Sequence, residues 1–118
     1  MSVCLAIGAV ALQLATGTFT LRWTHSVEKV RWEEDWIVGS DMLTLVQSRI
    51  KGSGAGMEPG PDAVWRGGWW VSPGQLQVPE LVLAASGATS SGWTLCADGA
   101  CRTLGAEAGG PVTIAPCG

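Results

Sequence analysis

The chain has little of what marks several common protein classes. It contains one histidine, one phenylalanine and no tyrosine, and 14% of its 118 residues are charged. Its seven lysines and arginines are scattered rather than grouped in a basic run, so nucleic-acid binding has little support. Disordered chains combine low hydrophobicity with high charge, and a hydrophobic content of 47% excludes that class.

Glycine and proline, by contrast, are abundant. The chain has seventeen glycines and six prolines, which predict many turns and no long uninterrupted helix. A length of 118 residues fits one domain with a single core. We therefore expect residues 1–118 to fold as one domain.

Residues 1–19, MSVCLAIGAVALQLATGTF, carry no charge and raise the question of an export or membrane segment. No lysine or arginine precedes the apolar run, as it would in a signal peptide. The run is also shorter than the roughly 20 apolar positions of a membrane-spanning helix, and it contains Gln13 and two threonines. Gly8 and the sequence Ala15-Thr16-Gly17 favour two strands joined by a short turn, with a signal or anchor as the alternative.

The clearest strand pattern runs from Phe19 to Val27. Its residues alternate between two faces, which is typical of a half-buried strand. One face carries Phe19, Leu21, Trp23, His25 and Val27, and the other carries Thr20, Arg22, Thr24 and Ser26. His25 and Ser26 therefore point to opposite faces of a regular strand and cannot act together as base and nucleophile.

Several further segments have the composition of strands separated by turns. Three turns, Gly39-Ser40-Asp41, Gly67-Gly68 and Asp98-Gly99, predict hairpins. On the strand 42–50 we expect one face to carry Met42, Thr44, Val46, Ser48 and Ile50. Residues 81–84 and 112–115 are two shorter strands. The sequence thus predicts an all-β domain, a small antiparallel barrel or sandwich of about eight to ten short strands with little or no helix.

The four cysteines allow three pairings. A two-residue turn at Asp98-Gly99 places Cys96 opposite Cys101, in a close pair whose Cα separation suits a disulfide. Cys4 and Cys117 lie near the two termini, and terminal strands that lie side by side would allow a second bridge. Four reduced thiols and a zinc site are the alternatives. Paired cysteines would favour a periplasmic or other extracytoplasmic location, and reduced cysteines a cytoplasmic one.

Three stretches, FTLRWTHSVEKVRWEEDW, SRIKGSGAGME and GGWW, resemble a known family in their order and spacing. The family is the bacterial and archaeal domain of unknown function 1850 (DUF1850), and the resemblance covers nearly the whole chain. Its pattern corresponds here to His25, Ser26, Val27 and Glu28, then to Glu33 or Glu34, then to Gly54, Ala55 and Gly56.

What the resemblance implies is an association rather than a reaction. The family has no established activity. Its members are often encoded beside a TRAP transporter of the TAXI type, a tripartite periplasmic system that uses sodium or protons to take up organic acids. Many members carry an N-terminal membrane segment before the β domain.

Two segments are candidate binding sites. His25, Ser26 and Glu28 could contact a ligand or a partner, or His25 could cap the apolar face while Glu28 pairs with a nearby cation. The glycine-rich loop after Arg49 and Lys51 could form a concave nest of backbone N–H groups for an anion, or be a loop that needs positive φ. We expect the binding residues to be His25, Ser26, Glu28, Arg49, Ser53, Gly54, Ala55 and Gly56, with no catalytic residue, no metal site and no cofactor.

Two other features have competing interpretations. The tryptophans could form an exposed patch for a partner, or they could be core and strand-pairing residues. The residues concerned are Trp32, Trp36, Trp65, Trp69 and Trp70. The run 31–35, RWEED, is most simply a solvated face, with calcium binding as a weaker alternative.

We therefore expect a non-catalytic accessory or binding domain associated with a TAXI-type TRAP transport system. It would bind a transporter subunit or a small anionic solute through the strand end at His25–Glu28 and the loop at Gly52–Gly56. The alternatives are a small enzyme that acts on an organic acid with His25 or Glu28 as general base, and a purely structural β domain.

Overall fold

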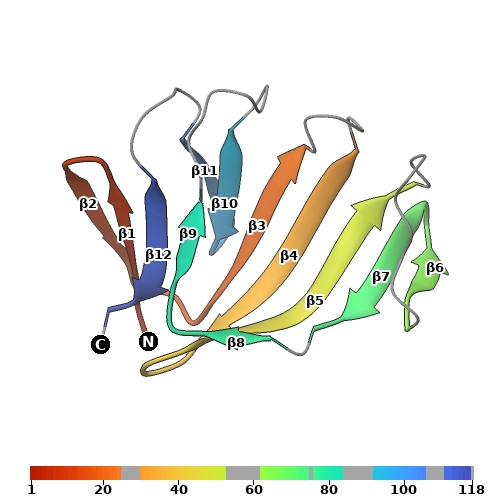
Figure 1. Cartoon of the computed structure of the whole chain (residues 1–118), viewed down its shortest axis with the longest axis horizontal. Helices are drawn as coiled ribbons and strands as arrows, with labels where there is room; N and C mark the ends of the chain where they lie inside the picture. The colour runs from red at the N-terminus through yellow and green to blue at the C-terminus, as the bar shows by residue number, and fades with distance from the viewer. Residues whose placement is uncertain (25–29, 53–61, 75, 84–91, 106–110, 118) are drawn as a thin grey trace.

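The computed structural model describes residues 1–24, 30–52, 62–74, 76–83, 92–105 and 111–117. These residues form twelve strands and no helix, arranged in two antiparallel sheets (Figure 1). The small sheet has the order β2-β1-β12-β9, from β2 (Val10–Leu14), β1 (Val3–Ile7), β12 (Val112–Pro116) and β9 (Leu81–Leu83). The prediction of an all-β sandwich is confirmed, although the strands outnumber the eight to ten expected, because several are very short.

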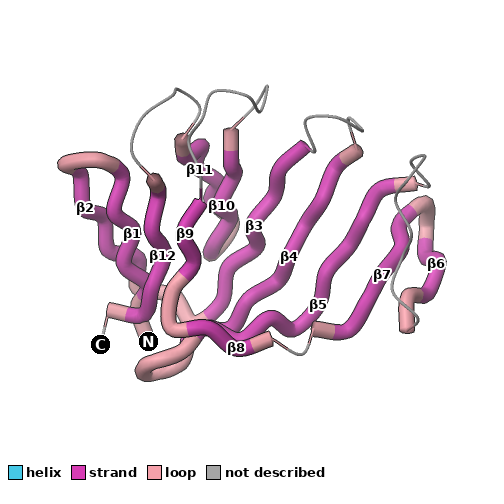
Figure 2. Tube along the Cα trace, viewed as in Figure 1, coloured by secondary structure: helices cyan, strands magenta, loops and turns pink. Residues whose placement is uncertain are grey.

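The large sheet has the order β11-β10-β3-β4-β5-β7-β6, with β8 paired to β5 at one end. Its strands are β11 (Ala100–Leu104), β10 (Trp93–Ala97), β3 (Thr18–Thr24), β4 (Arg31–Val38), β5 (Leu43–Lys51), β7 (Trp69–Pro73), β6 (Val64–Arg66) and β8 (Gln77–Val78). Figure 2 shows short turns between β1 and β2 and between β6 and β7. Gly8 lies in the first of these turns, and Gly67 and Gly68 form the second.

The core lies between the two sheets. The small sheet contributes Val3, Leu5, Leu83, Val112 and Ile114, and the large sheet contributes Phe19, Leu21, Trp36, Val38, Leu43, Leu95 and Leu104. In each sheet, alternation along the strands places these side chains on the face toward the other sheet. We call that face of the large sheet its inner face. The opposite face of the large sheet is the outer face, and its middle carries Arg22, Glu33, Asp35 and Arg49.

The N-terminal strands and the three hairpins predicted from the sequence are present. β1 and β2 pair as expected, and Gly8 in their turn has a φ of 59°. The turn at Asp98-Gly99 places Cys96 opposite Cys101, as predicted, with both turn residues at positive φ. Such a two-residue turn matches the twist of the strands that it joins.

Both cysteine pairs form disulfides. Cys96 and Cys101 have a Cα–Cα separation of 4.0 Å, and Cys4 and Cys117 one of 5.0 Å. The second bridge is possible because β1 and β12 are neighbours, with Cys4 opposite Ala115. The pairing predicted from the sequence is therefore confirmed, and it favours an oxidising, extracytoplasmic environment.

The face assignment predicted for β5 is wrong in its first half. Leu43 and Leu45, which pair with Val38 and Trp36, point into the core in place of the predicted Met42, Thr44 and Val46. Further along the strand, Ser48 and Ile50 share the inner face, as predicted. The reason is an irregularity in the ladder: Gln47 pairs with Asp35 and Leu45 with Trp36, so Val46 is an extra residue. A bulge of this kind reverses the alternation of the strand that carries it.

Five tryptophans lie in one row across the inner face of the large sheet. The row runs through Trp93, Trp23, Trp32, Ile50, Trp70 and Trp65. The rings of Trp93 and Trp23 are in contact, and from Trp23 onward each residue is the cross-strand partner of the one before it. The ring centroids of Trp23 lie 5.0 Å from Trp93 and 5.8 Å from Trp32. Trp36 lies in the core at 2% exposure, so the tryptophans that we considered as one exposed patch are divided between core, row and surface.

Candidate functional site

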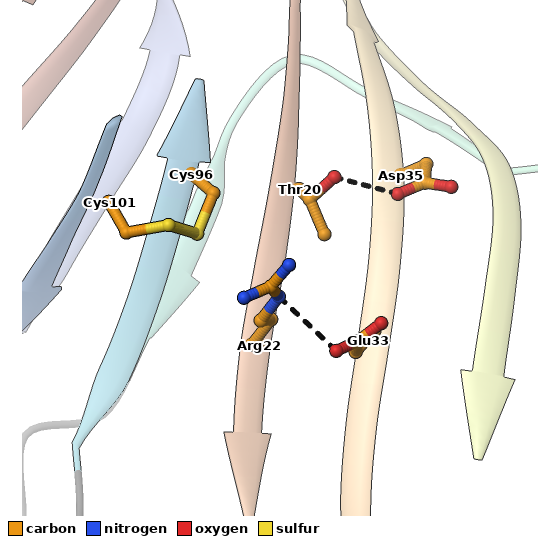
Figure 3. Close-up of a disulfide and its surroundings, with 6 residues drawn as sticks. All are labelled: Thr20, Arg22, Glu33, Asp35, Cys96 and Cys101. Atoms are coloured by element: carbon orange, nitrogen blue, oxygen red, sulfur yellow. Dashed lines mark hydrogen bonds and ion pairs between the residues drawn. A yellow bond between two sulfur atoms is a disulfide. The ribbon is translucent and has the colours of Figure 1, made fainter. Parts of the chain in front are cut away.

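A charge network occupies the middle of the outer face. Arg22 Nε lies 3.2 Å from Glu33 Oε2, and Arg49 Nε donates to Glu33 Oε1 at 3.0 Å. Arg49 also binds Asp35 through its two terminal nitrogens, and the Thr20 hydroxyl donates to Asp35 Oδ1 at 2.8 Å. Figure 3 shows the contacts between β3 and β4 beside the Cys96–Cys101 bridge. Two guanidinium groups and two carboxylates therefore neutralise each other here.

The network corrects the prediction for the run 31–35. Strand alternation places Glu33 and Asp35 on the outer face and Glu34 on the inner face, opposite Leu21 and Ser48. Glu33 is 8% exposed, because the two arginines cover it. The run is thus divided between two faces and is not a single solvated surface.

The electrostatics of the network favour its charged form. Burial alone would raise the pKa of Asp35, but hydrogen bonds from Arg49 and Thr20 and the charges of Arg49 and Arg22 hold that pKa below its ordinary value. At Arg49, the hydrogen bond to Asp35 raises the pKa of the guanidinium group more than burial lowers it, so this pKa lies above its ordinary value. Arg49 was predicted to contact a ligand; its guanidinium is engaged by these two carboxylates, and its role toward a ligand stays a prediction.

A hollow of about 390 Å³ opens at the end of the outer face where β3 and β5 finish, and its lining is Thr24, Val30, Arg31, Lys51 and Trp69. The Lys51 ammonium lies 4.9 Å from the centre of the Trp69 ring, a cation–π contact. No carboxylate in the described part of the chain forms an ion pair with Arg31 or Lys51. The hollow therefore combines two positive charges that pair with no described carboxylate, one hydroxyl and one aromatic face.

A larger hollow, of about 570 Å³, lies at the other end of the outer face. Its lining includes Asp35, Asp98, Ile37, Val46 and Cys96, together with Thr18 and Thr20. Its two carboxylates and the absence of a basic residue among its lining disfavour an anion. Size alone would select this hollow, but charge makes the smaller one the better anion site.

Most of the site residues predicted from the sequence lie outside the described residues: His25, Ser26, Glu28, Ser53, Gly54, Ala55 and Gly56. The strands that lead to them are described. β3 ends at Thr24, which pairs with Arg31 at the start of β4, and β5 ends at Lys51. Thr24, Arg31 and Lys51 all line the smaller hollow, so both predicted segments connect to the sheet at this hollow.

Sequence reasoning missed Arg31, Lys51 and Trp69 as members of one site. They are far apart in the chain, and only the pairing of β4 with β5 and of β5 with β7 brings them together. A signal was present: Lys51 and Arg31 flank the two segments singled out as candidate sites. The sequence does not say which arginines pair with Glu33 and Asp35, so it could not predict that Arg31 and Lys51 have no ion pair with a described carboxylate.

Two further properties bear on function. Among the described residues no group of three or more His, Cys, Asp or Glu side chains is placed to hold a metal ion. The described part of the chain also contains no helix with the length and apolarity needed to cross a membrane.

Comparison with known proteins identifies the family. No curated protein and no solved structure matches the chain. The family model for the domain of unknown function DUF1850 matches residues 19–104, which include the outer-face network, the smaller hollow and the Cys96–Cys101 hairpin. Since this match spans well over half of the sequence, the chain belongs to the DUF1850 family.

Proposed function

We propose that the chain is a non-catalytic binding domain that holds a small anionic solute, of the carboxylate class, in the hollow between Arg31, Lys51 and Trp69. The observation that carries the proposal is the contrast between the cations of the outer face. Arg22 and Arg49 are neutralised by Glu33 and Asp35, whereas Arg31 and Lys51 have no ion pair with a described residue.

The chemistry of the lining fits a carboxylate. The guanidinium group of Arg31 can donate two parallel hydrogen bonds to a carboxylate, and the Lys51 ammonium adds a point charge. Thr24 adds a hydroxyl donor, and the Trp69 ring offers an apolar surface to a short carbon chain.

A titration of the purified, oxidised protein tests the proposal. The probes are acetate, succinate, glutamate and inorganic phosphate, and binding is followed by calorimetry. We expect one or more carboxylates to bind, and Arg31→Gln to weaken that binding about tenfold or more, since charge-assisted hydrogen bonds are the strongest contacts available here. Arg102→Gln is the matched control, because Arg102 is an exposed cation on β11, outside the hollow.

Absence of binding by every probe to the folded protein would refute the solute proposal. So would equal losses in Arg31→Gln and Arg102→Gln, because an effect of overall charge does not distinguish one cation from another. A lower affinity at raised salt is expected in either case and decides nothing by itself.

We further propose that this domain serves a TAXI-type TRAP transport system as an accessory component. What supports this is membership of the DUF1850 family together with the two disulfides, which suit the compartment of a periplasmic solute receptor. The test is affinity purification from native membranes after mild cross-linking, without reducing agent. Recovery of transporter subunits is the expected result, and recovery of the domain alone would count against the association.

A further inference from the structure

The β6–β7 hairpin has an unusual composition for a strand pair at the edge of a sheet. Its residues 64–71 are VWRGGWWV, and β6 is the last strand of the large sheet. Figure 1 shows the hairpin at the end of the large sheet that is distant from the small sheet and from both termini. None of the described core residues comes from β6 or β7. The hairpin therefore extends beyond the packed sandwich.

The hairpin is apolar on both of its faces. Trp65 and Trp70 are cross-strand partners on the inner face, with ring centroids 5.2 Å apart. Val64 and Val71 form the pair on the other face. An antiparallel pair with one solvated face normally carries polar residues there, so apolar residues on both faces of an exposed hairpin require a further contact. Val64 is 51% exposed and Trp65 is 50% exposed.

Positive charge accompanies these apolar side chains. Arg66 is exposed and stands opposite Trp69, and the next strand carries Lys51 opposite the same tryptophan. Neither cation forms an ion pair within the ranges that the structure describes. The positive charge is local, because the whole chain has a formal net charge of −3.

We propose that the β6–β7 hairpin docks edge-on into the headgroup region of an anionic lipid bilayer. Tryptophan favours this region because its ring is apolar while its N–H can reach water, and arginine and lysine beside it contact lipid phosphates. Edge-on contact immerses both faces of β6 at once, which accounts for apolar residues on both. The backbone groups of β6 that pair with no described strand stay in the hydrated layer, where water satisfies them.

A protein partner fits these observations less well. A stable interface between proteins takes about 20–30 residues from each side. The hairpin offers eight residues, 64–71, at an extremity of the molecule. Interfacial binding to a bilayer needs only a few aromatic and basic side chains on one amphipathic element. Trp69 of the hairpin and Lys51 beside it also line the hollow, whereas Val64, Trp65 and Arg66 do not, so variants at these three positions test the hairpin separately from solute binding.

The experiment is co-sedimentation of the full, oxidised chain with vesicles of phosphatidylglycerol or of phosphatidylcholine. We expect binding to phosphatidylglycerol, weaker binding to phosphatidylcholine, and quenching of tryptophan fluorescence when the lipid chains carry bromine. Arg66→Gln should weaken binding to phosphatidylglycerol about fivefold and leave phosphatidylcholine binding unchanged. Trp65→Gln should weaken binding to both lipids by roughly tenfold, because the tryptophan ring supplies the largest apolar contact.

Two variants elsewhere serve as controls. Val82 on β9 is 59% exposed and matches Val64 and Trp65 as an exposed apolar residue, and Arg102 matches Arg66 as an exposed cation. Val82→Gln and Arg102→Gln should bind vesicles as the unaltered chain does. Thermal unfolding reports whether each variant folds. If Trp65→Gln does not fold, the vesicle binding of Arg66→Gln and the bromolipid quenching of the unaltered chain still test the docking of the hairpin.

Three outcomes would overturn the proposal. The folded chain could fail to bind phosphatidylglycerol vesicles, or the control variants could lose binding as strongly as the hairpin variants. The third outcome is a dimer in solution that Trp65→Gln abolishes, without vesicle binding, which would identify the hairpin as a contact between copies of the chain. This test is separate from that of the solute proposal. A chain that binds no carboxylate in the calorimetric titration should still co-sediment with vesicles and show bromolipid quenching.

Discussion

Glu33 and Glu34 are neighbours on β4, but their carboxylates have different surroundings. Glu33 faces outward between two arginines, whereas Glu34 faces inward and its side chain accepts one hydrogen bond, from Trp36 Nε1 at 3.3 Å. Burial raises the pKa of Glu34, and the bond from Trp36 only partly opposes this effect. The alternation of the strand is the cause, because it directs successive side chains to a charged face and to an apolar face.

Glu34→Gln should stabilise the protein at neutral pH. A folded-state pKa above the unfolded-state value means that ionised Glu34 opposes folding, so its contribution is most favourable at low pH and declines as pH rises through the folded-state pKa. Glutamine keeps an acceptor for Trp36 and removes the charge. We expect the free energy of unfolding at pH 7 to rise by about 0.5–1 kcal/mol, and the gain to vanish as the pH falls below the ordinary glutamate pKa.

Chemical denaturation at several pH values measures this effect. Glu80→Gln is the control, because Glu80 is exposed and should change the stability little at any pH. A destabilised Glu34→Gln protein at pH 7, or a gain that persists in acid, would show that the inward carboxylate does not oppose folding.

At the scale of elements, the end of β7 is held closely against β5. The Gly74 N–H donates to the carbonyl of Val46, the extra residue of the bulge, at 2.7 Å. The N–H of Leu45 donates to the carbonyl of Leu76 at 2.8 Å, so Gly74 and Leu76 both lie against β5, and β8 pairs with the same strand. This approach depends on the missing side chain of Gly74, since a Cβ there would lie 2.2 Å from the Leu45 carbonyl oxygen.

Gly74→Ala should therefore be strongly destabilising. A Cβ atom cannot occupy that position unless the backbone of β5 or of residue 74 moves, and forced movement in a packed region costs about 1–3 kcal/mol. Gly17→Ala is the matched control, because a Cβ at Gly17 meets nothing within 4 Å. Denaturant midpoints should separate the two variants clearly, and equal midpoints would mean that the approach of Gly74 to β5 does not restrict the fold.

At the scale of the whole molecule, the two disulfides differ in what they join. Cys4–Cys117 links positions 113 residues apart and connects β1 to the residue that follows β12. Cys96–Cys101 links positions five residues apart within one hairpin. A cross-link restricts the unfolded chain more strongly when it closes a longer loop.

Removing the long bridge should cost more stability than removing the short one. By the loop-entropy relation, the Cys4→Ser, Cys117→Ser double variant should lose about 5 kcal/mol, and the Cys96→Ser, Cys101→Ser variant about 2 kcal/mol. Guanidinium unfolding of the oxidised proteins measures both losses. The reverse order would show that the hairpin bridge stabilises the native state itself and not only restricts the unfolded chain.

Local sequence patterns determined much of the architecture. Period-two alternation defined β3, glycine-containing turns placed the hairpins, and the turn at Asp98-Gly99 set Cys96 opposite Cys101. These features depend on neighbours in the chain, so they can be deduced from the order of residues alone. Membership of the DUF1850 family could also be predicted from the sequence, and the family model confirms it over residues 19–104.

The tertiary structure alone decided what depends on contacts between distant strands. The bulge at Val46 arises in the pairing of β5 with β4, and no local signal announces the reversal of its faces. Likewise, the register of three strands decides that Glu33 pairs with Arg22 and Arg49. Among the described residues, this leaves Arg31 and Lys51 without an ion pair. A strand pattern says which side chains share a face, and only the register says which of them meet.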